Sequence, residues 1–282
     1  MEFIVLTPSN SVPKPVETGM RALLGDGPVA AAGRYHLESG GSRTRARLAL
    51  DAGKALGLIP DVAVCCAVAV ELLHNASLVH DDLQEKDDMR RGQPALWRRF
   101  GHQAAICAGD LMISAAFASL ALHPRPAQAL GLMHQAVADT ARGQADDLAA
   151  GSLSLYENRT LAMAKTGPLL ALPVRLALLA ADAPGDALAT KVGHKLAVAY
   201  QALDDLHDHE ADRAAGRTNL CMLFEAAGYA PQQAREMTRD EAGQSLKMAR
   251  GLAVGLQHRT GSAFCNLADR LDSALTEISD AA

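Results

Sequence analysis

The segment ELLHNASLVHDDLQEKDDMRRG, residues 71–92, ends a long apolar run in a cluster of acids that two arginines follow. Because residues 62–79 are apolar on most faces, they predict a helix in the centre of the protein. Asp81 and Glu85 are four residues apart and therefore share one face of that helix, one turn apart. Like charges at this spacing repel each other, and acids at a helix C-terminus oppose the macrodipole, so the cluster is unfavourable unless solvent or a cation compensates it.

A second apolar segment, residues 192–206, ends in a similar cluster. In AYQALDDLHDHEAD, residues 199–212, Asp204 and Asp208 repeat the four-residue spacing. One such cluster alone is explained equally well by a solvated helix end, but two of them beneath apolar helices indicate a metal site. Several hard oxygen ligands suit Mg²⁺, which bridges carboxylates to substrate phosphates.

The composition predicts an all-α protein. Of the 282 residues, 49% are hydrophobic but only 4% are aromatic. Alanine and leucine, which supply much of the apolar content, lose little side-chain entropy in a helix, and runs of β-branched or aromatic residues are scarce. Residues 1–16, with three prolines, predict an irregular lead-in. Residues 1–282 predict a single domain of about a dozen helices.

Charge and cysteine content exclude several classes of protein. The net charge of −5 argues against a nucleic-acid binder, which usually carries a basic excess. The five cysteines form no CxxC pair, so we expect neither a disulfide framework nor a zinc site. For the same reason we expect a cytoplasmic location. We expect no signal peptide. The apolar stretches Val62–Val70 and Leu169–Ala181 are shorter than the roughly 18–20 residues that span a bilayer, so we expect no transmembrane segment.

With both acid clusters, the sequence resembles the trans-isoprenyl diphosphate synthases, the polyprenyl synthetase family. Further motifs of that family occur in the same order: YHLESGGSRTR (Tyr35–Arg45), AGDLMISAAF (Ala108–Phe117), GQADDL (Gly143–Leu148), KTGPLL (Lys165–Leu170) and YQALDD (Tyr200–Asp205). The resemblance covers roughly residues 34–224. It implies an isoprenoid-synthase-like bundle around a central cavity, with the two acid motifs facing each other, and commonly a homodimer.

The resemblance also implies an activity and a set of site residues. The activity is Mg²⁺-dependent condensation of an allylic diphosphate with isopentenyl diphosphate, with more than one ion bridged by diphosphate. The implied metal ligands are Asp81, Asp82, Glu85, Asp204, Asp205 and Asp208, of which Asp205 is either a ligand or a partner of the ligands. Arg90 and Lys165 would bind the allylic diphosphate, and Arg45, His74 and Arg91 the isopentenyl diphosphate. The Lys165 carbonyl, Thr166 and Gln201 would stabilise the allylic cation.

Structural interpretations stay open for several of these residues. Arg90 and Arg91 could merely offset the neighbouring acids, and Lys165 could extend to the surface from an apolar helix. His74 could be an ordinary core histidine, and Thr166 and Gln201 ordinary polar residues of the core. Two other groups are interpreted as not catalytic: Gln144 and Asp147 as structural residues, and His80 as a partner of the acids.

Three departures from the family pattern concern the diphosphate sites. Ser42 stands where the family has lysine in GGKR, and Arg43 could replace that cation only by reaching around. Glu85 stands where the first motif ends in aspartate. The predicted loop over residues 209–219 is short, so Arg213 or Arg217 would have to act over the leaving diphosphate.

Small residues below the first acid motif predict a long product. Ala76 and Ser77 lie four and five residues before Asp81, about one turn down the helix, where relatives with short products carry aromatics. We therefore expect a product of geranylgeranyl length or longer, unless Met112 or Phe117 closes the tunnel. Two alternative functions remain: a regulatory subunit of a heteromeric synthase, suggested by Ser42, and a class I terpene cyclase, which shares the first motif.

Overall fold

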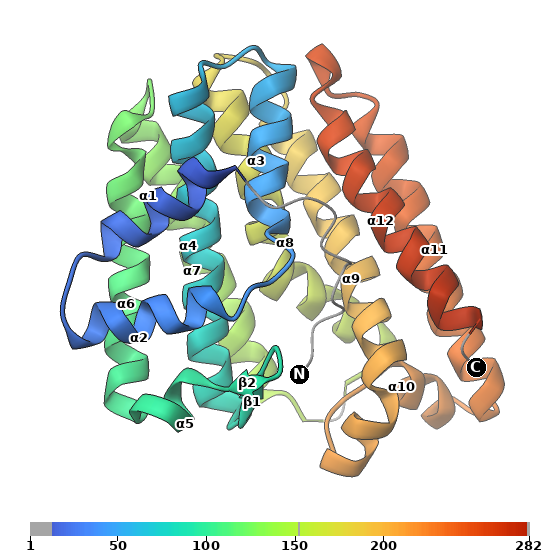
Figure 1. Ribbon diagram of the computed structural model, residues 1–282. Helices are drawn as coiled ribbons and strands as arrows, with labels where there is room; N and C mark the ends of the chain where they lie inside the picture. The colour runs from blue at the N-terminus through green and yellow to red at the C-terminus, as the bar shows by residue number, and fades with distance from the viewer. Residues whose placement is uncertain (1–12, 152, 281–282) are drawn as a thin grey trace. The chain divides into compact units, whose positions relative to one another are not determined.

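The computed structural model describes residues 13–151 and 153–280, and this part of the chain is almost entirely helical (Figure 1). It contains twelve α-helices, two 3-10 helices and one short hairpin. The predictions of an all-α protein and of about a dozen helices are therefore confirmed. The chain divides into two compact units, residues up to 133 with 176–183, and residues 134–175 with 184 onward. Each unit is described by itself, and the single domain stays a prediction.

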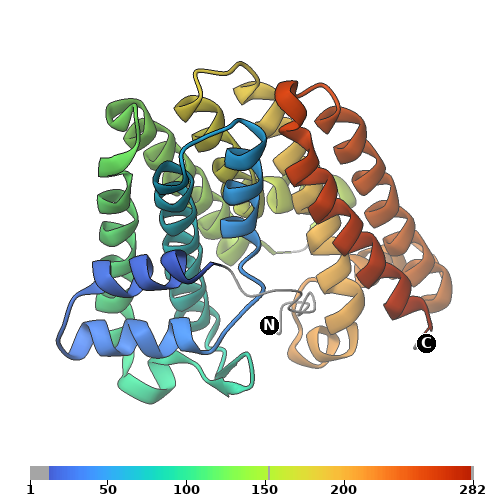
Figure 2. The ribbon, with the colours of Figure 1, turned by 45° about the horizontal axis from the view of Figure 1, so that its top comes forward.

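The first unit is built around α4 (Pro60–Glu85), most of whose residues are buried. Helices α6 (His102–Ser119) and α3 (Thr44–Ala55) pack along α4, while α1 (Lys14–Leu24) and α2 (Pro28–Glu38) run antiparallel across α4 and α6 (Figure 2). The smaller elements of this part are α5 (Leu96–Phe100), η1 (Leu120–Leu122), β1 (Met89–Arg90) and β2 (Gln93–Pro94). Helices α7 (Pro126–Ala149) and α8 (Leu155–Ala180) belong partly to each unit.

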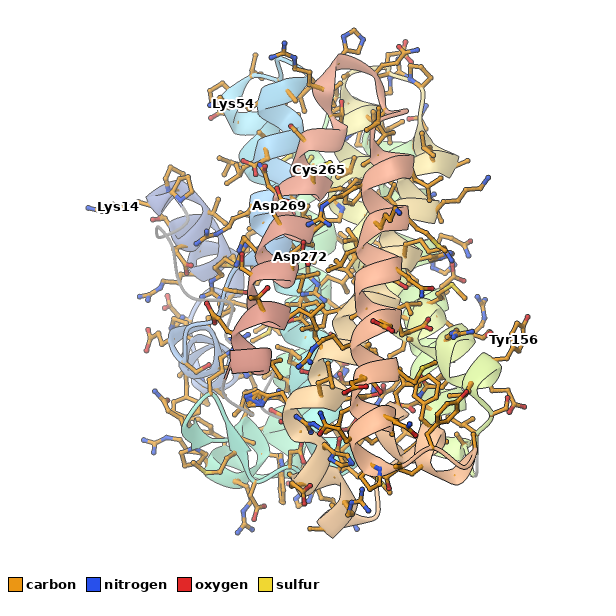
Figure 3. The ribbon with its side chains drawn as sticks, turned by 90° about the vertical axis from the view of Figure 1, so that its right-hand side faces the viewer. Lys14, Lys54, Tyr156, Cys265, Asp269 and Asp272 are labelled. Carbon is orange, nitrogen blue, oxygen red and sulfur yellow. The ribbon has the colours of Figure 1, made fainter. Side chains whose placement is uncertain are left out.

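In the second unit, α9 (Asp186–Ala215) packs mainly against α11 (Pro231–Ala253). The remaining elements are α10 (Leu220–Ala226), η2 (Gln257–Arg259) and α12 (Gly261–Asp280). Arg250 of α11 donates to Asp269 at 3.0 Å and to Asp272 at 2.8 Å. Figure 3 labels both acids on α12, which runs beside α11. This pair of ion pairs ties the last two helices together.

Small residues bring the helices of both units into close contact. A Cβ added at Gly53 of α3 would lie 2.9 Å from the Cβ of Ala63 on α4. A Cβ added at Gly193 of α9 would lie 2.7 Å from the Cβ of Ala171 on α8. Both distances are shorter than normal van der Waals contact, so these crossings require the glycines. The alanine-rich composition therefore permits close packing as well as helix formation.

Three expectations need correction. Helix α1 already begins at Lys14, because proline is tolerated in the first turn of a helix, while residues 1–12 of the predicted lead-in lie outside the described residues. Helix α9 continues to Ala215, so the second acid cluster lies inside a helix rather than at its end. The hairpin of β1 and β2 was not expected.

The expectation about membrane-spanning length is also wrong. By length and composition, three helical segments are long and apolar enough to cross a membrane: Pro60–Glu85, His102–Leu122 and Leu155–Ala180. The expectation considered only uninterrupted apolar runs. Isolated polar residues lower the mean hydropathy of a long segment very little. In Pro60–Glu85, 83% of the apolar window is buried inside the protein. The absence of a transmembrane segment stays a prediction.

Candidate functional site

The first acid cluster occupies the last turns of α4, as expected. Asp82 is buried at 1% exposure, whereas Asp81 and Glu85 are half-buried. The helix ends because Lys86 adopts a left-handed conformation with φ 59°. The cluster therefore combines one buried carboxylate with two that are reachable from solvent.

A tight turn brings two arginines back toward these acids. In the β1–β2 hairpin, Arg90 pairs with Gln93, so Arg91 and Gly92 form a two-residue turn. Both turn residues have positive φ, 53° and 74°, which is the conformation that hairpin turns of this length favour. Arg90 therefore lies on the strand and Arg91 at its turn, and their side chains reach different partners.

Arg90 binds the buried carboxylate of the first motif. Its Nε donates to Oδ1 of Asp82 at 2.8 Å, and Nη2 donates to the same oxygen. Asp87 lies 3.9 Å from Nη2. Burial raises the pKa of Asp82, although the hydrogen bonds and charge of Arg90 oppose the shift. Oδ2 of Asp82 is buried without a hydrogen-bond partner, which leaves one carboxylate oxygen to be satisfied.

Arg45, His74 and Arg91, predicted to share a diphosphate site, lie together in the first unit. Nη1 of Arg45 donates to Nε2 of His74 at 3.1 Å. Burial, followed by the charges of Arg45 and Arg91, holds the pKa of His74 well below its usual value, so the ring is neutral and accepts this bond. Arg91 donates to the carbonyl of Gly40. Gly41 has φ 114°, a conformation that favours glycine, and a Cβ there would lie 2.5 Å from Cζ of Arg91 and displace that guanidinium.

A buried carboxylate that the sequence analysis did not single out positions Arg45. Glu71, 1% exposed, accepts from the backbone N–H of Ala46 at 3.1 Å, in the first turn of α3. The amide of Asn75 also donates to Glu71, at 3.3 Å. Because the first N–H groups of a helix lack partners within it, Glu71 both caps α3 and complements its dipole. The start of α3, and thus Arg45, is thereby fixed against α4.

Arg43 is held away from the role of the missing lysine. Its Nε lies 2.8 Å from Oε1 of Glu17, and its Nη2 donates to the carbonyl of Leu37 at 2.8 Å. Its Nη1 lies 3.7 Å from Glu71. The side chain is 8% exposed. Arg43 therefore serves the packing of α1, α2 and α4, and Ser42 leaves the site without a lysine.

His80 connects the first acid cluster to α6. Its ring lies so close to Gly109 that any side chain at that position would overlap it. Nε2 of His80 lies 3.8 Å from Oδ1 of Asp110. The contact gives the AGD motif a physical role, and the interpretation of His80 as a partner of the first acid cluster stays a prediction.

In the second cluster, the three aspartates have different environments. Asp204 and Asp205 are buried and Asp208 is half-buried. Oδ1 of Asp205 accepts from Gln201 and Oδ2 accepts from the backbone N–H of Leu220, both at 2.8 Å. Burial raises the pKa of Asp205 to about 7, although these hydrogen bonds oppose the shift. With both oxygens bonded to protein, Asp205 fits a partner of the metal ligands better than a direct ligand.

Asn219 ties the chain after α9 back onto this cluster. Its Nδ2 donates to the carbonyl of Asp205 at 2.8 Å and to Oδ2 of Asp212 at 2.9 Å. Its Oδ1 accepts from the N–H of Cys221 at 3.0 Å and so caps α10. The side chain is completely buried. The sequence analysis gave Asn219 no role, although asparagine before an apolar helix is a common cap signal.

The predicted loop over residues 209–219 is mostly helix, and only residues 216–219 connect α9 to α10. Arg213 lies in the helical part and binds Glu225, with Nη2 donating at 2.6 and 2.8 Å. It also lies 2.9 Å from Nε2 of His209. Arg217 is half-buried in the connection. Which of the two arginines acts near the leaving diphosphate stays open.

Lys165 of the KTG motif pairs with the GQADDL motif. Its Nζ donates to Oδ2 of Asp147 at 2.7 Å. A Cβ at Gly143 would lie 2.6 Å from the backbone nitrogen of Lys165, so this glycine lets α7 and α8 cross closely enough for the ion pair. Asp147 was interpreted as structural, and the structure gives it a specific partner. Thr166 follows on α8 and is half-buried.

The two predicted floor residues differ in accessibility. Ala76 has no exposed surface, whereas Ser77 is half-buried and donates to the carbonyl of His74 at 2.8 Å. Met112 is fully buried, and its Cε would lie 3.3 Å from a Cβ added at Gly33 on α2. Ser77 is therefore the better candidate for a tunnel wall, and the open floor stays a prediction.

The carboxylates have the donor atoms that a divalent metal prefers, but they are not arranged around one point. Among residues 13–151 and 153–280, no three histidine, cysteine or acidic side chains already converge on one point. Each motif nevertheless supplies hard oxygen donors, and the unsatisfied Oδ2 of Asp82 costs free energy unless a cation or proton meets it. Within the first unit the candidate ligands are Asp81, Asp82 and Glu85, and within the second unit they are Asp204 and Asp208. The shared metal site stays a prediction.

Comparison with known proteins supports this assignment of motifs. The sequence profile of the polyprenyl synthetase family matches residues 28–221. The (2E,6E)-farnesyl diphosphate synthase of Mycobacterium tuberculosis H37Rv is 38% identical over 173 residues, which make up 59% of this chain and 48% of that protein. The chain thus spans about half the length of the mycobacterial relatives. The probable farnesyl diphosphate synthase of Bradyrhizobium diazoefficiens is 34% identical over 281 residues, covering 92% of this chain and 82% of that protein.

The fold comparison agrees. A solved geranylgeranyl pyrophosphate synthetase from the archaeon Geoglobus acetivorans matches with a TM-score of 0.81 at 25% identity. The match covers 92% of this chain and 97% of that chain.

The Asn219 network predicts a large effect on stability. Asn219→Ala should lower the free energy of unfolding by about 2–3 kcal/mol, because it removes the cap of α10 and the hydrogen bonds to the carbonyl of Asp205 and to the buried carboxylate of Asp212. Urea unfolding followed by circular dichroism measures this. Thr218→Ala, at the neighbouring exposed position, is the matched control and should change stability by less than about 0.5 kcal/mol. Equal stability of the two variants would contradict the assigned role.

Proposed function

The chain belongs to the polyprenyl synthetase family, and on this premise we propose that it condenses an allylic diphosphate with isopentenyl diphosphate into a longer prenyl diphosphate. The observation that carries the proposal is the charge arrangement within the first unit. There, the acids that end α4 lie beside Arg90, and Arg45, His74 and Arg91 form a separate group that suits a diphosphate. Lys165 and the second acid cluster supply the corresponding groups of the second unit.

Enzymes of this family use a divalent metal, and we propose Mg²⁺, held by Asp81, Asp82, Glu85, Asp204 and Asp208. When bound, it neutralises the charge that develops on the leaving diphosphate. The allylic diphosphate is bound by Arg90 and Lys165. On binding, Arg90 exchanges its contact with Asp82 for phosphate oxygens, and Lys165 does the same with its contact to Asp147. Gln201 and Thr166 direct their dipoles at the allylic cation, and the buried helices exclude water from it.

For the product, we propose geranylgeranyl length or longer. The named relatives include both farnesyl and geranylgeranyl diphosphate synthases, so their names do not decide the length. Support comes from the small residue Ser77, which is half-buried one turn below Asp81. A small side chain at this depth leaves room for a growing chain.

We also propose a homodimer, formed through α6. Only 44% of the apolar window in residues 102–122 is buried, compared with 83% in α4. Ile106 on this helix is 49% exposed. An apolar helix with this much exposed surface is typical of an interface, and a second copy of the chain offers the same face by symmetry. Sedimentation equilibrium of the purified chain distinguishes a dimer from a monomer.

The function is tested with the chain purified alone. Incubation with Mg²⁺, isopentenyl diphosphate and primers of ten, fifteen and twenty carbons should yield a longer diphosphate, detected by mass. Asp81→Ala and Asp204→Ala should each lower turnover by roughly a thousandfold or more, because the negative charge that holds the metal is lost. Asp88→Ala is the matched control, since Asp88 is exposed and pairs with exposed Arg98 at 3.0 Å.

Two outcomes would contradict this proposal. Product formation only with a second subunit would favour the regulatory alternative. A hydrocarbon or alcohol formed without isopentenyl diphosphate would favour the cyclase alternative.

Ser77→Phe should shorten the product, because a phenyl ring would fill the space one turn below the first acid motif. The measurement is the product length distribution with a ten-carbon primer. Ser77→Ala removes only a hydroxyl and should leave the distribution unchanged. An unchanged distribution in an active, folded Ser77→Phe variant would refute the proposed floor.

A further inference from the structure

The group of residues suited to isopentenyl diphosphate has one cation fewer than the family pattern provides. Ser42 replaces the lysine, and Arg43 is held by Glu17 and the carbonyl of Leu37. A phosphate group normally satisfies its oxygens with several donors. A further donor near Arg91 would therefore complete the site.

His36 is placed where such a donor is needed. It lies on α2, one turn before Ser39 and Gly40, the residues to which Arg91 donates. The ring is 2% exposed. Burial, followed by the charges of Arg91, Arg90 and Arg43, lowers the pKa of His36 to about 3, so the ring is neutral. The same histidine contributes to the electrostatic environment of His74. His36 thus belongs to the same group of charges as Arg91 and His74.

The Nε2 atom of His36 is buried and no donor or acceptor meets it in hydrogen-bonding geometry, although the nearby side chain of Asn75 acts to raise the pKa of the ring. An unsatisfied buried polar atom costs about 1–3 kcal/mol, and in native proteins such atoms call for an explanation. The neighbouring Asn75 donates to the carbonyl of Glu71 at 2.8 Å, and its own Oδ1 is also unsatisfied. A phosphate oxygen that accepts from Nε2 would satisfy His36, and the negative charge of diphosphate would suit the surrounding arginines.

We propose that His36 is a binding residue for the diphosphate of isopentenyl diphosphate, where its imidazole N–H takes over part of the role of the lysine absent at position 42. The inference rests on the proposed function, because it adds a residue to one substrate site of that reaction. A neutral imidazole offers one N–H donor without adding a charge to a region that already holds three arginines. His36 is assigned to isopentenyl diphosphate because Arg91, which is proposed for that substrate, donates to Ser39 and Gly40 within one turn of His36.

The test compares variants that keep or remove the donor. His36→Leu should raise KM for isopentenyl diphosphate by about tenfold or more, because a hydrogen bond to a charged group is lost. KM for the allylic diphosphate and kcat should change by less than about threefold. His36→Gln retains an N–H donor and should stay close to the wild type. Ser42→Lys added to His36→Leu should restore most of the lost affinity.

Calorimetric titration with isopentenyl diphosphate measures the same binding without turnover. The titration separates this inference from the proposed function. A wild-type chain that makes no product would refute the function. The affinities of the wild type and of His36→Leu for isopentenyl diphosphate could still be compared by titration. If His36→Leu does not fold, His36→Ala with and without added imidazole replaces it, and imidazole should restore binding.

Two results would overturn the role of His36. One is unchanged affinity for isopentenyl diphosphate in a folded variant without the donor. The other is a parallel rise of KM for isopentenyl diphosphate and for the allylic diphosphate, together with a lowered melting temperature and no rescue by Ser42→Lys. That result would show that His36 and Asn75 serve packing only.

Discussion

The organisation of the first unit depends on one constraint: the polar groups of the buried helix α4 must find partners on other elements. Burying a polar or charged group without a partner costs several kcal/mol. Glu71 meets the N-terminus of α3, His74 meets Arg45, and Asp82 meets Arg90. The partners lie on two other segments, the start of α3 and the hairpin, so these contacts fix both relative to α4. The residues proposed for catalysis and the residues that hold the helices together are largely the same.

The two ion pairs of the motif residues differ in how strongly they are held. Arg90 and Asp82 are both buried, so removing one of them would leave an uncompensated buried charge, which is costly. Lys165 and Asp147 lie nearer the surface, where solvent weakens an ion pair. A diphosphate that draws Arg90 away from Asp82 would therefore have to bring a cation for that carboxylate, whereas Lys165 can leave Asp147 at a smaller cost.

Much of the helical fold and of the candidate site could be predicted from the sequence, because the signals that decide them are local. The four-residue spacing of Asp81 and Glu85 placed both on one helical face, and the alanine-rich composition predicted the helices. The contacts that were missed join residues distant in the chain, such as Lys165 with Asp147 across α7 and α8. The hairpin was missed because its turn uses Arg91 before Gly92, and arginine is not a typical residue at positive φ. The length of α9 was missed because charged residues after an apolar segment predict a helix end equally well.

Small residues have two roles in this chain, and Ala76 shows why the two must be separated. At Gly143 and Gly109 the small residue is required by packing, since the backbone of Lys165 and the ring of His80 occupy the space of a side chain. Ala76 has no exposed surface, so its size is explained by the same close packing of α4, without any tunnel. A phenylalanine at Ala76 would overpack the core, and a change of product would then not distinguish a blocked tunnel from a distorted helix. At Ser77 the side chain is only half-buried, so the space beside it is not already filled by protein. Ser77 is therefore the residue that bears on product length, and the scarcity of aromatic residues elsewhere in the chain does not bear on it.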